Sequence, residues 1–221
     1  MSAHIVKVLE SNFLTHNIKR FVLEKPSGYT FISGQATDVS INKPGQEEEL
    51  RPFTFTSVNG SDYLEFTIKI YKGHNGVTEK LTEINAGDEL IVHDVFGTIT
   101  YQGPGLFIAG GAGITPFISI FRQLKLDNLL YGNSLLFANR NVDDIILRDE
   151  LNEMLGGSYF DIIEEQGYGI YKQIIDIRLL KQYVDGVRKY YYICGPDKFT
   201  LSMIGHLKDL GVDESFIIYE K

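Results

Sequence analysis

The periodicity of the sequence changes once, at Gly103-Pro104-Gly105, and this change limits the chain to a two-part fold. Before it, apolar and polar residues alternate, as in Leu64–Ile70 and Glu89–His93, which is the period of a half-buried strand. After it, short apolar runs alternate with longer amphipathic stretches, which is typical of parallel strands joined by crossover helices. We therefore predict two domains, residues 1–103 and 104–221.

The first domain is predicted to be a small antiparallel β-barrel, because short strands separated by turn signals favour that architecture. A single helix is expected within it, over Gly76–Ile84. Besides the two alternating runs, the expected strands are Ile5–Leu9, Arg20–Leu23, Thr37–Ile41, Phe53–Val58 and Thr98–Tyr101.

The second domain is predicted to be an α/β domain with a parallel sheet. The expected strands are Leu106–Ala109, Ser134–Ala138, Tyr159–Ile163, Tyr190–Cys194 and Ser215–Tyr219. The expected helices are Pro116–Lys125, Ile145–Leu155, Ile174–Val184 and Pro196–Leu210.

Charge and cysteine content exclude several classes of protein. The net charge is −8 and no long cluster of Lys and Arg occurs, which argues against nucleic acid as a partner. A single cysteine, Cys194, excludes an intrachain disulfide, a multi-cysteine zinc site and a Cys₄ iron–sulfur cluster. The uncharged stretch Val95–Phe121 contains six glycines and two prolines, which a membrane helix would not tolerate. We expect no metal, no membrane partner and a cytoplasmic location.

A glycine loop, Gly110–Pro116, directly follows the first predicted strand of the α/β domain. Glycines allow a ligand to approach the backbone closely, and the start of the next helix offers free amides to an anion. Thr115 is expected to cap that helix and Pro116 to occupy its first position. Pro116 replaces the third glycine of the GxGxxG motif, and a plain tight turn is the alternative reading.

Three further segments are candidates for binding. Arg51–Ser57 is a strand in which alternation places Arg51 and Phe53 on one face and Thr54 on the other, although an edge strand with an exposed arginine would look the same. Gly73–Thr78 is a glycine turn that opens the helix of the barrel. Cys194–Pro196 ends a buried strand, where ligands of α/β sheets bind, but a lone cysteine is more often inert packing.

Taken in order, the segments RPFTFTS, GVT, GGAGITP and CGPDKF resemble those of the ferredoxin–NADP reductase superfamily. The chain is similar to its compact flavodoxin and ferredoxin reductases and to the reductase modules of oxygenases. The resemblance implies that the barrel binds FAD, with FMN as the alternative, and that the α/β domain binds NADPH or NADH. It also implies that the two ligands meet in the cleft between the domains.

The resemblance implies roles for residues of the barrel. Arg51 would bind the flavin pyrophosphate, Phe53 would pack along the flavin, and the Thr54 hydroxyl would approach flavin N5. Further cofactor contacts would come from Ile68, Lys69, Ile70 and Tyr71, and from the pyrophosphate-capping residues Gly76, Val77 and Thr78. The family usually has tyrosine at the position of Phe53, so a phenolic hydrogen bond worth about 1 kcal/mol is missing.

The resemblance also implies roles in the α/β domain. The dinucleotide would be held by Gly111, Gly113, Ile114, Thr115 and Pro116, and its nicotinamide would lie beside Cys194, Gly195 and Pro196. Cys194 would be a polarisable wall and Glu220 a proton relay. Plant-type members end on an aromatic residue that stacks on the flavin, whereas this sequence ends on Lys221.

The choice of dinucleotide depends on the end of the second strand of the α/β domain. NAD-selective folds place an acid there, whereas this chain has Asn139-Arg140 followed by Asp143 and Asp144. Arg140 could pair with the 2′-phosphate of NADPH, with adenine or with Asp144. The sequence therefore favours NADPH.

The implied reaction passes hydride from NAD(P)H to FAD and then single electrons to a separate protein, because the chain has no iron–sulfur motif of its own. The expected acceptors are flavodoxin, ferredoxin or an oxygenase component. An acidic acceptor would need a local basic patch. The candidates are Lys19, Arg20, Lys69, Lys72 and Lys80. The alternatives are a reductase that uses free flavin as substrate and a non-catalytic nucleotide-binding module.

Overall fold

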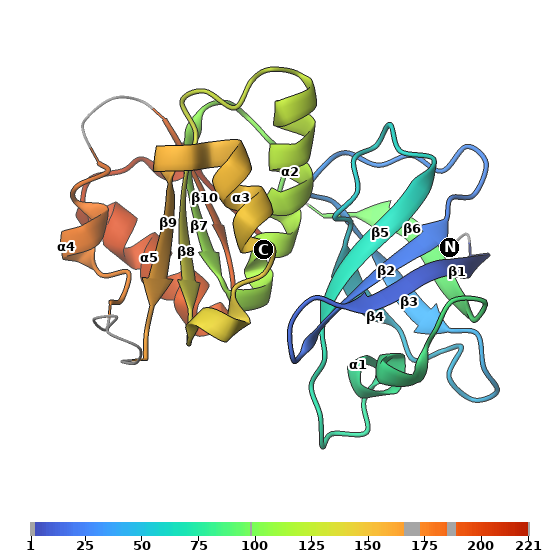
Figure 1. Cartoon of the computed structure of the whole chain (residues 1–221). Helices are drawn as coiled ribbons and strands as arrows, with labels where there is room; N and C mark the ends of the chain where they lie inside the picture. The colour runs from blue at the N-terminus through green and yellow to red at the C-terminus, as the bar shows by residue number, and fades with distance from the viewer. Residues whose placement is uncertain (1–2, 98, 166–172, 185–188, 221) are drawn as a thin grey trace.

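The computed structural model describes residues 3–97, 99–165, 173–184 and 189–220 of the chain. Two bodies lie side by side, each built on its own sheet (Figure 1). The first sheet has six antiparallel strands and the second has five parallel strands. The predicted fold class, an antiparallel barrel followed by an α/β domain, is confirmed.

The antiparallel sheet closes into a barrel. In the order of the sheet, its strands are β4 (Arg51–Thr54), β3 (Ala36–Ile41), β6 (Glu89–Phe96), β1 (His4–Phe13), β2 (Ile18–Glu24) and β5 (Tyr63–Lys69). Beyond β4, Phe55 forms a bridge with Phe66 of β5, which joins the two edges of the sheet. Both phenylalanines are completely buried in the barrel core. The predicted helix is present as α1 (Val77–Lys80) and a 3₁₀ turn over Leu81–Glu83.

One predicted strand of the barrel is wrong. Thr98 lies outside the described residues, and Ile99–Tyr101 form no strand. Ile99 is buried in the core of the second domain, and the amides of Gln102 and Gly103 donate to the hydroxyl of Tyr192, at 2.8 and 3.0 Å. The segment is therefore attached to the α/β domain and not to a strand of the barrel.

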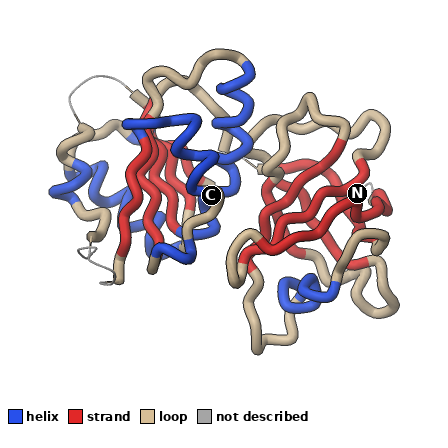
Figure 2. Tube along the Cα trace, viewed as in Figure 1, coloured by secondary structure: helices blue, strands red, loops and turns tan. Residues whose placement is uncertain are grey.

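The parallel sheet is covered by helices on both faces (Figure 2). Its strands, in the order of the sheet, are β11 (Ile217–Tyr219), β10 (Tyr190–Cys194), β7 (Gly105–Gly110), β8 (Ser134–Asn139) and β9 (Tyr159–Ile163). The helices are α2 (Thr115–Leu126), α3 (Arg148–Leu155), α4 (Ile177–Leu180) and α5 (Asp197–Asp209). Phe107 of β7 packs toward α2 and α3, whereas Leu106 and Ile108 pack toward α4 and α5. Burial on both faces explains the uninterrupted apolar runs of the sequence.

Three elements of this domain begin later than predicted, because local turns precede them. α3 begins at Arg148 since Leu147 adopts a left-handed conformation, with φ of 51°. α4 begins at Ile177 because the Asp176 carboxylate accepts the first free amides of the helix. β11 begins at Ile217, after a 3₁₀ turn capped by Asp213.

The uncharged stretch 95–121 is divided among the end of β6, strand β7, a 3₁₀ turn and the start of α2. Within the described ranges, no helix combines the length and the apolar character that crossing a bilayer would require.

Candidate functional site

The strand order of the parallel sheet predicts where a ligand binds. Ligands of open α/β sheets bind at the carboxyl ends of the strands, where the strand order reverses. Here the order reverses at β7, whose neighbours are β8 on one side and β10 on the other. Strand β7 ends at Gly110 and β10 ends at Cys194, which are the starts of two segments predicted to bind the dinucleotide.

A cleft of about 480 Å³ opens at this point, between the two domains. The barrel contributes Asn17, Ile18, Lys69 and Tyr71 to its lining. The α/β domain contributes Gly110–Gly113, Ala138–Arg140, Asp144, Ile146, Glu164, Gly195, Pro196 and Phe199. The cleft therefore joins the predicted glycine loop to a predicted flavin-binding segment of the other domain.

The glycine loop lies in direct contact with the end of β10. A Cβ added to Gly113 would lie 2.3 Å from the carbonyl oxygen of Cys194 and 2.6 Å from the amide nitrogen of Gly195. A Cβ on Gly195 would lie 2.6 Å from the ring of Phe199. Close packing therefore favours glycine at both positions. The glycine loop also lines the cleft, so its backbone is accessible to a ligand there.

The predicted capping role of Thr115 is wrong. Residues Gly111–Ile114 form a 3₁₀ turn, so the helix N-cap is Ile114 and Thr115 is the first residue of α2. The Thr115 hydroxyl donates to the carbonyl of Ala112, at 3.1 Å. The side chain of Ile114 is buried in the core, as is Pro116, so Ile114 can meet a dinucleotide only through its backbone.

Cys194 lies beside the last described residue of the chain, Glu220. Both residues line a second hollow of about 470 Å³, which shares Gly195 with the cleft. Burial, together with the nearby charge of Glu220, raises the pKa of the Cys194 thiol to about 12. The thiol is therefore neutral near pH 7, which suits a polarisable wall better than a nucleophile.

The flavin-side residues of β4 are partly accessible. Arg51 is exposed, and its Nη1 donates to the carbonyl of Leu50 at 2.6 Å. Phe53 and Thr54 are half-buried, and the ring of Phe53 packs on the barrel core beside Phe66. These residues lie outside the lining of the cleft itself.

The structure brings two of the four side chains predicted over 68–71 to the cleft. Ile68 and Ile70 are buried in the barrel core, so the prediction for these two residues concerns their backbone. The strand period places their neighbours on the opposite face. Lys69 and Tyr71 line the cleft, with the Lys69 ammonium 5.7 Å from the centre of the Tyr71 ring.

The predicted pyrophosphate turn is already partly closed by a carboxylate. Glu79 accepts hydrogen bonds from the amides of Gly73, His74 and Asn75, at 2.9, 3.0 and 2.6 Å. These bonds hold the pKa of Glu79 below its ordinary value. Gly76 is the N-cap of α1 and has no side chain that could cap the helix. Among the described residues, the first-turn amides of Val77 and Thr78 are therefore left as donors for an outside acceptor. The Val77 side chain itself is buried in the core.

Lys19, which the sequence suggests for a docking patch, is instead a structural support. Its side chain is buried, and Nζ donates to the carbonyls of Leu81, Thr82 and Ile84, at 3.3, 2.8 and 2.7 Å. Burial lowers the pKa of Lys19. Its ammonium binds the end of the 3₁₀ turn that follows α1, and so holds the pyrophosphate turn on the barrel.

The end of β8 differs from the sequence-based expectation. Arg140 forms an ion pair with Glu165, not with Asp144. Asn139 is buried and lines the cleft, and within the described part of the chain neither polar atom of its carboxamide has a hydrogen-bond partner. A buried amide without partners is costly, so this group is prepared for a ligand. The sequence gives no sign of its burial.

These features fit a dinucleotide and a flavin. The backbone contact at Gly113 forms a close-fitting loop, Asn139 offers a free donor and acceptor, and the first turn of α1 offers amides. An antiparallel barrel and a parallel α/β domain that share a cleft define the class of two-domain flavin- and nicotinamide-dependent oxidoreductases. Residues 5–101 match the oxidoreductase FAD-binding domain family, and residues 107–203 match the oxidoreductase NAD-binding domain family. The chain belongs to the ferredoxin–NADP reductase superfamily.

Relatives of known function are reductases. The chain is 31% identical over 178 residues to NADH-cytochrome b5 reductase 1 of Emericella nidulans, covering 73% of this chain and 54% of that protein. It is 28% identical over 230 residues to the enzyme of the same name from Aspergillus terreus, covering 91% and 76%. The chain thus spans about half the length of the first of these relatives.

Solved structures share the fold across the whole chain. A ferredoxin NADP⁺ reductase from Neisseria gonorrhoeae with bound FAD and NADP superposes with a TM-score of 0.84 at 18% identity, covering 100% of this chain and 98% of that one. The cytochrome b5 reductase domain of Ulva prolifera nitrate reductase gives 0.81 at 21% identity, covering 99% and 97%.

Proposed function

We propose that this chain transfers hydride from a nicotinamide dinucleotide to bound FAD and passes the electrons singly to a separate protein. The observation that supports this proposal most directly is the shared cleft, in which the glycine loop 110–113 of one domain and Lys69 and Tyr71 of the other line one space. Flavin supplies the ability to accept a hydride and release electrons one at a time. The protein's part is to bind, align and exclude water.

We assign the individual roles as follows. Arg51 and the first-turn amides of α1 bind the flavin pyrophosphate, and Phe53 and Tyr71 contact the ring. Thr54 offers its hydroxyl to flavin N5. In the α/β domain, the backbone of 111–116 holds the dinucleotide, and Cys194–Pro196 flank the nicotinamide. Glu220 is exposed beside Cys194, where a carboxylate can exchange protons with solvent.

We further propose that NADH is the preferred donor, against the leaning of the sequence. The charge of Arg140 is already paired with Glu165, and Asp144 and Glu164 also line this end of the cleft. A 2′-phosphate would meet these carboxylates, and such like-charge contacts cost several kcal/mol. The free carboxamide of Asn139 suits the neutral hydroxyls of a ribose instead.

The expected result is a kcat/KM for NADH about tenfold or more above that for NADPH. Glu165→Gln should release Arg140 and raise the efficiency with NADPH several-fold while leaving NADH little changed. Glu153→Gln is the matched control, because Glu153 is also an exposed acid in an ion pair, with Lys125. A wild-type preference for NADPH would contradict the assignment.

For the acceptor, we propose a small haem protein of the cytochrome b5 type, as the names of the relatives suggest, in place of flavodoxin, ferredoxin or an oxygenase component. The predicted basic patch is reduced, because Lys19 is buried, Arg20 binds Glu65 and Glu10, and Lys80 binds Glu49. Lys69, which lines the cleft, and Lys72, which is exposed, remain as candidates for docking.

An anaerobic titration tests the function. The protein should purify yellow, lose its flavin absorbance on addition of about one equivalent of NADH per flavin, and regain it when oxidised cytochrome b5 is added. A colourless protein that reduces added FAD would indicate a free-flavin reductase. A yellow protein that neither NADH nor NADPH bleaches would indicate a non-catalytic nucleotide-binding module. Recovery with flavodoxin or ferredoxin but not with cytochrome b5 would reject the proposed acceptor alone.

A further inference from the structure

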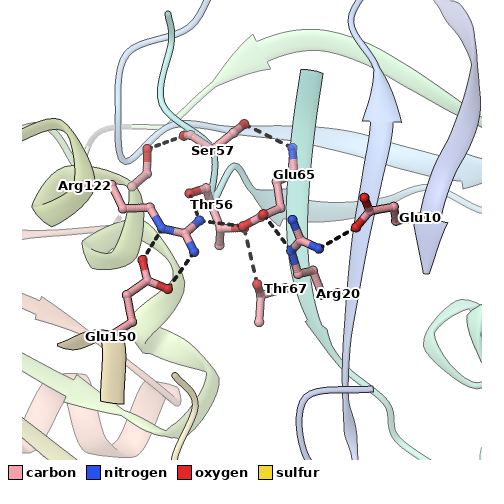
Figure 3. A network of polar contacts seen from close by, with 9 residues as sticks. Glu10, Arg20, Thr56, Ser57, Glu65, Thr67, Arg122 and Glu150 are labelled. Atoms are coloured by element: carbon pink, nitrogen blue, oxygen red, sulfur yellow. Dashed lines mark hydrogen bonds and ion pairs between the residues drawn. The ribbon is translucent and has the colours of Figure 1, made fainter. Parts of the chain in front are cut away.

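Two polar side chains of helix α2, Ser119 and Arg122, form hydrogen bonds with the barrel. Figure 3 shows Arg122 between the barrel and helix α3. The Ser119 hydroxyl donates to the carbonyl of Ser57, at 2.6 Å. Nη1 of Arg122 donates to the carbonyl of Thr56 at 2.8 Å and to Oε1 of Glu65 at 2.6 Å. Helix α2, which follows the glycine loop, therefore binds the chain segment that follows strand β4.

On the barrel side, the partner of Arg122 is itself held firmly. Glu65 is only 2% exposed, and it also accepts from the Thr56 hydroxyl and from Nε of Arg20, both at 2.7 Å. Burial alone would raise the pKa of Glu65, but the charges of Arg122 and Arg20 and the hydrogen bonds it accepts outweigh burial and lower it. Glu65 is therefore an ionised group with fixed partners.

On the other side, Arg122 is held within its own domain. Glu150 of α3 accepts from Nε at 2.5 Å and from Nη2 at 2.9 Å, which is a bidentate pair (Figure 3). The planar guanidinium is thus bound along two edges, one facing α3 and one facing the barrel. Arg122 thus bonds to both neighbours of α2, helix α3 and the barrel.

The contact is linked to both predicted sites through the chain, although its residues do not line the cleft. Arg122 is seven residues beyond Thr115, where α2 begins, which is about 10 Å along the helix axis. Thr56 is two residues beyond Thr54, and hydride transfer is very sensitive to geometry, since a misplacement of about 1 Å can cost 100-fold in rate. Buried ion pairs add little net stability, so this network is better explained by the orientation it imposes.

We propose that Arg122 is a positioning residue that sets the alignment of the nicotinamide against the flavin by binding Glu65 and Thr56 across the domain interface. The inference rests on the proposed function in one respect, that hydride passes between the two domains. Arg122 acts through Glu65 and the backbone of Thr56, and it need not touch either ligand.

The test compares Arg122→Met with Lys125→Met. Lys125 lies on the same helix and binds Glu153 of the same neighbouring helix at 2.7 Å, but that ion pair is confined to the α/β domain. For Arg122→Met we expect the rate of flavin reduction at saturating NADH to fall about tenfold and the deuterium isotope effect to rise. The KM for NADH and the FAD content should stay near those of the wild type. Lys125→Met should match the wild type.

A readout independent of activity follows the contact itself. Hydrogen exchange in the holoprotein should accelerate over residues 55–67 and α2 in Arg122→Met but not in Lys125→Met. Arg122→Lys should recover part of the rate of flavin reduction, because lysine keeps the charge but cannot bond along two edges as the guanidinium does. If Arg122→Met does not fold, Ser119→Ala, which removes one neutral bond of the same interface, should show the same changes to a smaller degree.

The proposal would be overturned if Arg122→Met showed faster hydrogen exchange over 55–67 but reduced its flavin as fast as Lys125→Met. The contact would then be lost without effect on the chemistry. If Ser119→Ala is used in place of Arg122→Met, an unchanged isotope effect together with faster hydrogen exchange would also overturn the proposal. If neither NADH nor NADPH reduces the wild-type protein, although hydrogen exchange shows that the contact is present, the proposed function on which the inference rests would be rejected instead.

Discussion

Gly113→Ala is expected to lower the free energy of unfolding by about 3 kcal/mol and to abolish dinucleotide binding. The new Cβ would lie 2.3 Å from the carbonyl oxygen of Cys194 and 2.4 Å from its carbonyl carbon. Both atoms belong to the backbone, so no change of side-chain rotamer can relieve the overlap. Either the glycine loop or the end of β10 must move, and each is proposed to contact the nicotinamide dinucleotide.

Urea denaturation and a titration with NAD⁺ measure the two effects. Gly205→Ala is the matched control, because Gly205 lies exposed within α5 and an added Cβ there would meet no atom within 4 Å. In a helix this change should stabilise the protein, by about 0.5–1 kcal/mol. An unfolding free energy for Gly113→Ala within about 0.5 kcal/mol of the wild type would show that the loop has freedom that the structure does not indicate.

Arg51→Ala should yield a largely colourless protein that is otherwise folded. We expect the affinity for FAD to fall about 100-fold, since a guanidinium bound to a pyrophosphate makes two charge-assisted hydrogen bonds of about 1.5 kcal/mol each. Arg51 is exposed and its Nη1 donates to the carbonyl of the adjacent residue, Leu50, so its loss should not disturb the barrel. The FAD affinity of Arg51→Lys should lie between those of the wild type and Arg51→Ala, because lysine keeps the charge and loses the two-pronged hydrogen bonding of the guanidinium.

The flavin content after gel filtration and the thermal unfolding of the apoprotein check this prediction. Lys7→Ala, which removes another exposed cation of the barrel, should retain its flavin. If the Arg51→Ala protein elutes as yellow as the wild type, Arg51 does not bind the flavin pyrophosphate. The role implied by the family resemblance would then be rejected for this position.

Together these variants separate the two halves of the site. Gly113→Ala acts on the dinucleotide and leaves the barrel intact, whereas Arg51→Ala acts on the flavin and leaves the cleft intact. Arg122→Met should leave both ligands bound and slow only the transfer between them. Three distinct results from three residues would be difficult to explain by a general loss of stability.

Much of the fold could be predicted because periodicity is a local property. Tyr159–Ile163 and Tyr190–Cys194 were expected as strands and are observed with the same bounds. Tyr190–Cys194 lies inside a sheet covered on both faces, where the apolar run and the strand coincide, whereas Tyr159–Ile163 is an edge strand. The prediction failed at Ile99–Tyr101, where Ile99 packs in the core of the other domain and the next amide, that of Gln102, donates to Tyr192.

The site could be predicted in part for a similar reason. Glycine loops and a strand-end cysteine carry their signal in a few adjacent residues, and the cleft joins several of them. The supporting polar groups give no such signal. Lys19, Glu79 and Arg122 look like ordinary surface charges in the sequence. In the structure Lys19 binds three carbonyls, Glu79 accepts from the amides of the pyrophosphate turn, and Arg122 bonds across the domain interface.

The sequence by itself determined two sheets of different kinds and the places where their backbones can approach a ligand, because alternation, apolar runs and glycine spacing act on neighbouring residues. Only the tertiary structure decided which charges are buried and how the two domains meet. Arg122 and Glu65 are 57 residues apart, and their bond exists because α2 packs on the barrel. No local pattern encodes the choice of a partner at such a distance, since it depends on how two independently formed surfaces fit together.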